Sequence, residues 1–210
     1  MLYHNRWETK GTHFGDCFTA DDAEFMYVHI PKNASSWTRK KAIDLGWSLQ
    51  NYHQSNLQNK HAIIVLRDPL ERWLSGIVEY FYRYHKNTIL EQINDTTFDI
   101  LADVGSVDAH TEQQVYYIEG LNYKNCTFFY CDANYSHELT SFLNCHNYNV
   151  DYSNSNFVYS SKDNYEKQLL LSMFSQMLEN PKHIKHLKGH FSKDYQLLDQ
   201  ITFYKSHDQI

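Results

Sequence analysis

Residues 25–37 read FMYVHIPKNASSW and residues 61–75 read HAIIVLRDPLERWLS, and these two stretches decide the fold. Each begins with a short apolar run, at 25–30 and at 61–66, of the kind that forms a strand buried in a sheet. Each run ends in a polar turn, after which the apolar residues take helical spacing. Strands that alternate with helices in this way are typical of an α/β protein with a parallel sheet between layers of helices.

Further segments continue the alternation. Strands are predicted at 47–53 and 126–131, and helices at 35–45, 69–84, 135–145, 163–179 and 191–204. Asp68 is expected to cap the helix that begins with Pro69, because this pair of residues is common at helix starts. In the last helix, Tyr195, Leu198 and Ile201 are expected to face inward. Residues 1–24 are polar and lack periodicity, so we expect an irregular N-terminal arm before a single domain at 25–210.

The composition excludes several classes of protein. The 210 residues carry 19 Lys+Arg and 25 Asp+Glu, a formal net charge of −6, which argues against a generally basic nucleic-acid binder. No run of 18 apolar residues predicts a membrane span, and the first residues contain no apolar signal segment. We therefore expect a cytoplasmic protein with reduced cysteines, no nucleic-acid partner and no membrane span.

The first motif, Ile30–Trp37 (IPKNASSW), has the composition of an anion-binding turn. A helix that follows a strand presents unsatisfied backbone N–H groups and the positive end of its dipole. Small residues let a phosphate approach the backbone; they are Asn33, Ala34, Ser35 and Ser36. Lys32 adds a positive charge, and Ser35 or Ser36 is expected to cap the helix, which should end at Gly46. Taken alone, the motif is equally compatible with an ordinary turn.

The second motif places Arg67 at the end of a predicted parallel strand, where ligands bind in open α/β sheets. Its guanidinium suits a phosphate monoester, and Ser75, two helical turns further on, adds a hydroxyl donor. Taken alone, this motif has a simpler interpretation. Arg67 would form a surface ion pair with Asp68, and Ser75 would have no special role.

Together the two motifs resemble those of the sulfotransferases that use 3′-phosphoadenosine 5′-phosphosulfate (PAPS), and in particular the carbohydrate sulfotransferase branch. The resemblance assigns Arg67 and Ser75 to a clamp on the 3′-phosphate. It assigns the loop for the 5′-phosphosulfate to Lys32, Asn33, Ala34, Ser35, Ser36 and Trp37. Asp108–Gln113 (DAHTEQ) and Ser192–Ile201 (SKDYQLLDQI) are more weakly similar to that branch. The implied fold is P-loop NTPase-like, with three layers and a central parallel sheet.

The activity that the resemblance implies is transfer of a sulfuryl group from PAPS to an acceptor hydroxyl, with a carbohydrate favoured. Lys32 would neutralise charge on the leaving phosphate, and no metal is implied. A base should take the acceptor proton. His53 follows the second predicted strand, as the base of the cytosolic sulfotransferases does. His110 and Glu79 are the alternatives.

Other interpretations stay open. A small kinase should carry a GxxxxGK[ST] loop, and here the lysine precedes the small residues instead. A non-catalytic protein that binds adenosine 3′,5′-bisphosphate (PAP) would differ only at the base. Residues 160–162 are either a loop that closes over the nucleotide or an ordinary polar loop. The histidines at 183, 186 and 190 are expected in a solvated basic turn, interrupted at Gly189, and not in a zinc site.

Overall fold

A computed structural model describes residues 14–53, 57, 59–85, 93–150 and 164–206. The chain divides into two compact units, each described here by itself. The sheet unit comprises His13–Arg67, Tyr117–Phe157 and Gln200–Ile210. The helical unit comprises Met1–Thr12, Asp68–Tyr116 and Val158–Asp199.

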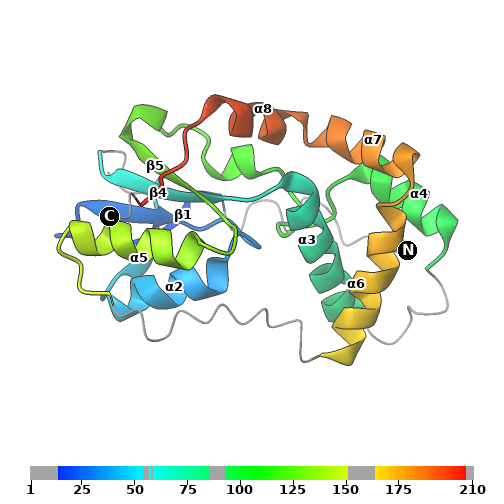
Figure 1. Ribbon diagram of the computed structural model, residues 1–210, viewed down its shortest axis with the longest axis horizontal. Helices are drawn as coiled ribbons and strands as arrows, with labels where there is room; N and C mark the ends of the chain where they lie inside the picture. The colour runs from blue at the N-terminus through cyan, green and yellow to red at the C-terminus, as the bar shows by residue number, and fades with distance from the viewer. Residues whose placement is uncertain (1–13, 54–56, 58, 86–92, 151–163, 207–210) are drawn as a thin grey trace. The chain divides into compact units, whose positions relative to one another are not determined.

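The sheet unit is built on five strands in the order β3-β1-β2-β4-β5, of which Figure 1 labels β1, β4 and β5. Their bounds are β1 (Asp16–Thr19), β2 (Phe25–Val28), β3 (Ser48–Asn51), β4 (His61–Leu66) and β5 (Cys126–Tyr130). β2, β4 and β5 are parallel, with Met26 opposite Ala62 and Ile63 opposite Thr127. β1 is antiparallel to both β2 and β3. The protein is therefore α/β with a mixed sheet, and the prediction of a parallel sheet is wrong for β1.

β1 also corrects the expectation of an irregular arm over residues 1–24. Cys17 lies opposite Val28 on one side and Gln50 on the other, so β1 is an inner strand of the sheet. Cys17, Phe18 and Thr19 are all buried. A strand of four residues in a polar segment is too short to show a hydrophobic period. Its place in the sheet depends on backbone hydrogen bonds to distant segments, which the local sequence does not reveal.

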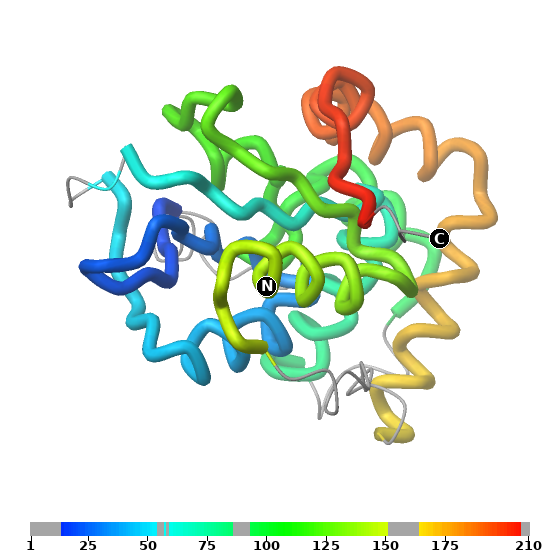
Figure 2. The backbone as a smooth tube through the Cα atoms, turned by 60° about the vertical axis from the view of Figure 1, so that its left-hand side comes forward, coloured from blue at the N-terminus to red at the C-terminus, as the bar shows by residue number. Residues whose placement is uncertain are grey.

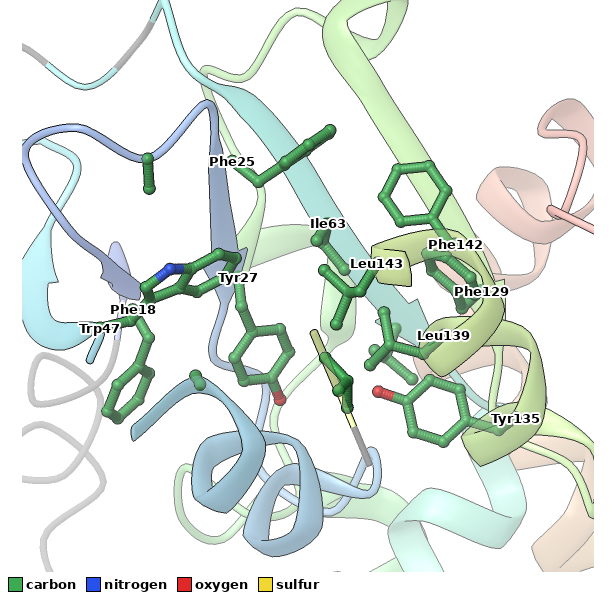
Figure 3. Packing of buried hydrophobic residues seen from close by; sticks show 14 residues of the cluster. Phe18, Phe25, Tyr27, Trp47, Ile63, Phe129, Tyr135, Leu139, Phe142 and Leu143 are labelled. Carbon is green, nitrogen blue, oxygen red and sulfur yellow. The ribbon is translucent and has the colours of Figure 1, made fainter. Parts of the chain in front are cut away.

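One face of the sheet is covered by α2 (Ser35–Asp44) and α5 (Tyr135–Cys145) (Figures 1 and 2). The buried side chains between these helices and the sheet form a hydrophobic cluster that is rich in aromatic rings, as Figure 3 shows. Its larger members are Phe18, Phe25, Tyr27, Trp47, Ile63, Val65, Phe129, Tyr135, Leu139, Phe142 and Leu143. Met26, Val28 and Ile64 point to the opposite face and are buried too, as expected for strands of a parallel sheet.

Two short 3₁₀ turns occur among the described residues. η1 (Gln114–Tyr117) belongs to the helical unit except for Tyr117, and η2 (Tyr123–Asn125) belongs to the sheet unit. The C-terminal segment returns to the sheet, where the Tyr204 amide donates to the Phe128 carbonyl oxygen over 2.8 Å. The described residues include all four cysteines and contain no disulfide.

The helical unit contains five α-helices among its described residues. They are α3 (Pro69–Tyr84), α4 (Asp95–Val104), α6 (Tyr165–Met177), α7 (Pro181–His190) and α8 (Ser192–Gln200). Asp68 caps α3 as predicted, because its carboxylate accepts from the amides of Leu70 (2.9 Å) and Glu71 (3.0 Å). The apolar faces of α3 and α6 meet at Phe81 and Phe174, whose ring centroids are 5.0 Å apart.

The solvated basic turn expected around the later histidines is instead the helix α7. Asn180 caps it and Pro181 stands in its first turn, so the start signal outweighs the cost of about 1 kcal/mol for a glycine inside a helix. His183 is buried and contacts the Asp99 carboxylate over 3.0 Å. Within the described ranges, no three metal-ligating side chains gather at one point.

The last helix is shorter than expected, and the face that it buries is only partly the expected one. α8 ends at Gln200 and its buried residues are Asp194 and Leu197, while Tyr195 packs partly buried against the apolar cluster of the helical unit, as expected. The Asp194 carboxylate accepts from the amides of Gln114 (2.9 Å) and Val115 (3.0 Å), a role that a hydrophobic pattern does not reveal. None of the helices in the described part of the chain has the length and apolar character needed to cross a membrane.

Candidate functional site

The loop between β2 and α2 has an unusual backbone. Lys32 and Ala34 have φ of 70° and 55°, in the left-handed region that residues other than glycine rarely occupy. Each such residue costs about 1–2 kcal/mol, so the surrounding structure must hold the conformation. Turns that alternate in this way can direct successive backbone N–H groups toward one point, where an anion binds.

Two groups of contacts hold this loop. Asn33 is completely buried, and its Nδ2 donates to the Val65 carbonyl oxygen of β4 over 2.8 Å. The Ala34 carbonyl oxygen accepts from the amides of Trp37 and Thr38, both at 3.1 Å, and from the Thr38 hydroxyl at 3.2 Å. The loop is therefore fixed to a neighbouring strand at one residue and to the first turn of α2 at the next.

The start of α2 differs from the expected serine cap. The N-cap is Ala34, and no side chain caps the helix. The amides of Ser35 and Ser36 make no hydrogen bond to another described residue, and the first turn holds no acidic residue. A helix start of this kind favours a negatively charged group, because it combines unsatisfied donors with the positive end of the dipole.

Arg67 follows the last residue of β4 and is half-buried. β2 and β4 are adjacent and parallel, so their carboxyl ends reach the same edge of the sheet. The loop with Lys32 therefore follows the end of β2, and Arg67 follows the end of the neighbouring strand β4, both within the sheet unit. Such an edge is where ligands bind in open α/β sheets.

Ser75 differs from the other predicted nucleotide-binding residues. It lies on α3, half-buried, and belongs to the helical unit. Lys32, the residues through Trp37 and Arg67 all belong to the sheet unit. The structure therefore brings the predicted loop and Arg67 together in one unit, and Ser75 is not part of it.

His53 is exposed and stands just beyond β3. β3 runs in the same direction as β2, because both are antiparallel to β1. Its carboxyl end thus reaches the same edge, two strand spacings or about 10 Å from the loop after β2. The His53 amide donates to Asn51 Oδ1 over 3.0 Å, and the imidazole contacts the Tyr52 ring at a tilt of 46°, with ring centroids 4.3 Å apart.

The two alternative bases are both in the helical unit. The His110 Nδ1 lies 2.8 Å from Oδ2 of the buried Asp108, a pairing that orients an imidazole for proton transfer. Glu79 is buried, and its two carboxylate oxygens contact Arg83 Nε at 2.5 Å and Lys167 Nζ at 2.9 Å. These two ion pairs fix the Glu79 side chain to α3 and α6 inside the helical unit.

The sequence did not indicate the buried contacts that support the loop. Tyr135 of α5 lies 2.7 Å from the Thr38 hydroxyl, although 97 positions separate them. Burial raises the pKa of Tyr135 well above its ordinary value, so this hydroxyl stays protonated. No local pattern predicts such a pair, because only the packing of α5 on the sheet brings them together.

Comparison with protein-family models, with curated proteins and with solved structures finds no match to this chain. Residues 160–162, predicted as a loop near the nucleotide or an ordinary polar loop, lie outside the described residues.

Proposed function

We propose that this protein is a PAPS-dependent sulfotransferase that transfers a sulfuryl group to an acceptor hydroxyl, with a carbohydrate as the favoured acceptor. In this proposal the mixed sheet is the centre of a three-layer, P-loop NTPase-like fold. The sequence motifs at 30–37 and 67–75 supply the resemblance, and the geometry of the sheet edge supports it.

One observation carries the proposal. The strained loop after β2 leads into an uncapped helix start, and Arg67 begins at the end of the adjacent parallel strand. A bisphosphorylated nucleotide needs two anion sites, and this edge offers one at the helix start and a guanidinium beside it. Lys32 adds a second cation to the same edge.

The chemistry resembles phosphoryl transfer, in which catalysis consists mainly of positioning and charge stabilisation. The acceptor oxygen attacks the sulfur in line as the bond from sulfur to the bridging oxygen of the 5′-phosphate breaks. Lys32 and the amides at the start of α2 stabilise the negative charge that develops on the leaving phosphate. His53 takes the acceptor proton; the strand end that carries it lies at the same sheet edge, two strand spacings or about 10 Å from the loop, with β1 between them.

Thermal unfolding with PAP, AMP and ATP tests the nucleotide assignment. We expect PAP to raise the Tm more than AMP or ATP at equal concentration, since a ligand stabilises the state that binds it. Incubation with labelled PAPS and a panel of sugars, small alcohols, lipids and peptides then tests turnover. PAP binding without transfer to any acceptor would instead favour a non-catalytic PAP-binding protein, and equal shifts with all three nucleotides would oppose the assignment.

A further inference from the structure

A short chain of hydroxyl groups runs from α5 to the loop after β2. The Thr38 hydroxyl lies 2.7 Å from the Tyr135 hydroxyl and 3.2 Å from the Ala34 carbonyl oxygen. Thr38 and Tyr135 are both buried. Figure 3 shows the Tyr135 ring extending from α5 with its hydroxyl directed into the cluster.

Thr38 joins the two groups. Its hydroxyl donates to the Ala34 carbonyl oxygen, which can only accept, and either hydroxyl can be the donor in the contact between Thr38 and Tyr135. The chain therefore runs from Tyr135 through Thr38 to Ala34, and hydrogen bonds of this kind polarise and strengthen one another.

This chain ends on a residue whose conformation is costly. Ala34 has a φ of 55° and is the last residue before the amides of Ser35 and Ser36. A left-handed residue persists only where its surroundings hold it in place. The Thr38 hydroxyl is one of the three donors on the Ala34 carbonyl oxygen, and it is the only one of the three that a side chain supplies.

From these contacts we infer that Thr38 and Tyr135 are positioning residues for the anion-binding loop, and that they set the affinity for the 5′-phosphate of the bound nucleotide without touching it. The inference rests on the proposed function. It assigns an α5 residue, remote in sequence, to the binding of one particular phosphate group.

The first test compares two ligands in calorimetry, PAP and adenosine 3′-monophosphate, which lacks the 5′-phosphate. Thr38→Val keeps the shape of the side chain and removes the hydroxyl. We expect PAP binding to weaken about fivefold to tenfold, the size of one buried hydrogen bond, and binding of the 3′-monophosphate to change less than twofold. Thr38→Ser restores the hydroxyl and should return PAP binding to within about twofold of the wild type.

The chain offers a matched control. Thr140 is buried on α5, and its hydroxyl also donates to the carbonyl four residues earlier, Ser136 O, over 2.7 Å. Thr140→Val removes an equivalent hydrogen bond and should leave PAP binding unchanged. An equal loss in both valine variants, or an equal loss of both ligands in Thr38→Val, would mean that Thr38 is only structural and would overturn the inference.

Tyr135→Phe provides a second variant in case Thr38→Val does not fold. It should weaken PAP binding about threefold to fivefold, because Thr38 keeps its bond to Ala34 but loses its hydrogen bond with Tyr135. Wild-type affinity in this variant would overturn the role of Tyr135. Failure of the wild-type protein to bind PAP would instead contradict the proposed function, so the two failures are distinguishable.

Discussion

Asn33 Nδ2 donates to the Val65 carbonyl oxygen over 2.8 Å and so ties the loop after β2 to the neighbouring strand β4. Val65 stands two residues before Arg67, so this hydrogen bond links the loop of the first motif to the strand that carries the second. The pair explains how a loop with two left-handed residues keeps one conformation at the edge of the sheet.

The first prediction concerns this hydrogen bond. Asn33→Ala leaves a buried carbonyl without its donor, so we expect a loss of about 1–3 kcal/mol in the free energy of unfolding and weaker PAP binding. Asn125→Ala is the control, because its Nδ2 donates to the carbonyl oxygens of Asn59 and Lys60, just before β4 begins. Urea denaturation and calorimetry measure both effects. Unchanged PAP affinity in a folded Asn33→Ala protein would argue against the role of this bond.

The second prediction tests the strain at Ala34. Glycine adopts a φ of 55° at little cost, so Ala34→Gly should raise the free energy of unfolding by about 1 kcal/mol. Gly46 has a φ of 79° with open space where a Cβ would stand. Gly46→Ala should therefore lower the free energy of unfolding by about the same amount, through backbone strain alone. Opposite changes in Tm are expected. A loss of stability in Ala34→Gly would show that the left-handed conformation is not strained.

The third prediction separates the candidate bases. His53→Ala should abolish transfer from labelled PAPS while PAP binding stays within about twofold, because a base acts on the acceptor proton and not on the nucleotide. His110→Ala should keep most of the turnover if His53 is the base. The reverse result would transfer the role to the pair of His110 and Asp108, whose contact of 2.8 Å already orients the imidazole.

The fourth prediction concerns pH and the contact between α4 and α7. Lys182 and His183 hold the pKa of Asp99 below its ordinary value near 3.8. A lowered pKa in the folded state adds stability above pH 3.8, and this stability is lost as the pH falls through the folded pKa. Asp99→Asn should therefore lower the Tm near neutral pH, and the difference from the wild type should close below about pH 3.8. A difference that stays constant down to pH 2 would contradict this account.

The local signals in the sequence predict the elements that follow strong patterns. The run at 61–66 matches β4, and Asp68 and Pro69 mark the start of α3, because capping and apolar periodicity are properties of adjacent residues. The same approach fails for β1, which depends on pairing with β2 and β3. It also fails for α7, because the cap at Asn180 starts a helix that the glycine at 189 does not interrupt.

The candidate site likewise has features that the sequence predicts and features that only the fold creates. The residue types of the loop and Arg67 could be chosen from the sequence, because charge and small size are properties of the residues themselves. The left-handed conformation of Ala34, the bond from Asn33 to Val65 and the contact of Thr38 with Tyr135 could not be predicted. Each depends on tertiary packing, which brings together residues that lie 32 and 97 positions apart.

The most direct test of the central claim is calorimetric titration of PAP into the wild type, Lys32→Ala and Arg67→Ala. Lys205→Ala is the control, because this lysine pairs with Glu138 over 3.1 Å at a distant position of the sequence. We expect each of the two site variants to bind PAP at least about tenfold more weakly, the size of one charge-assisted contact, and the control to bind like the wild type. If both site variants bound PAP with wild-type affinity, the claim that this sheet edge binds the nucleotide would be wrong.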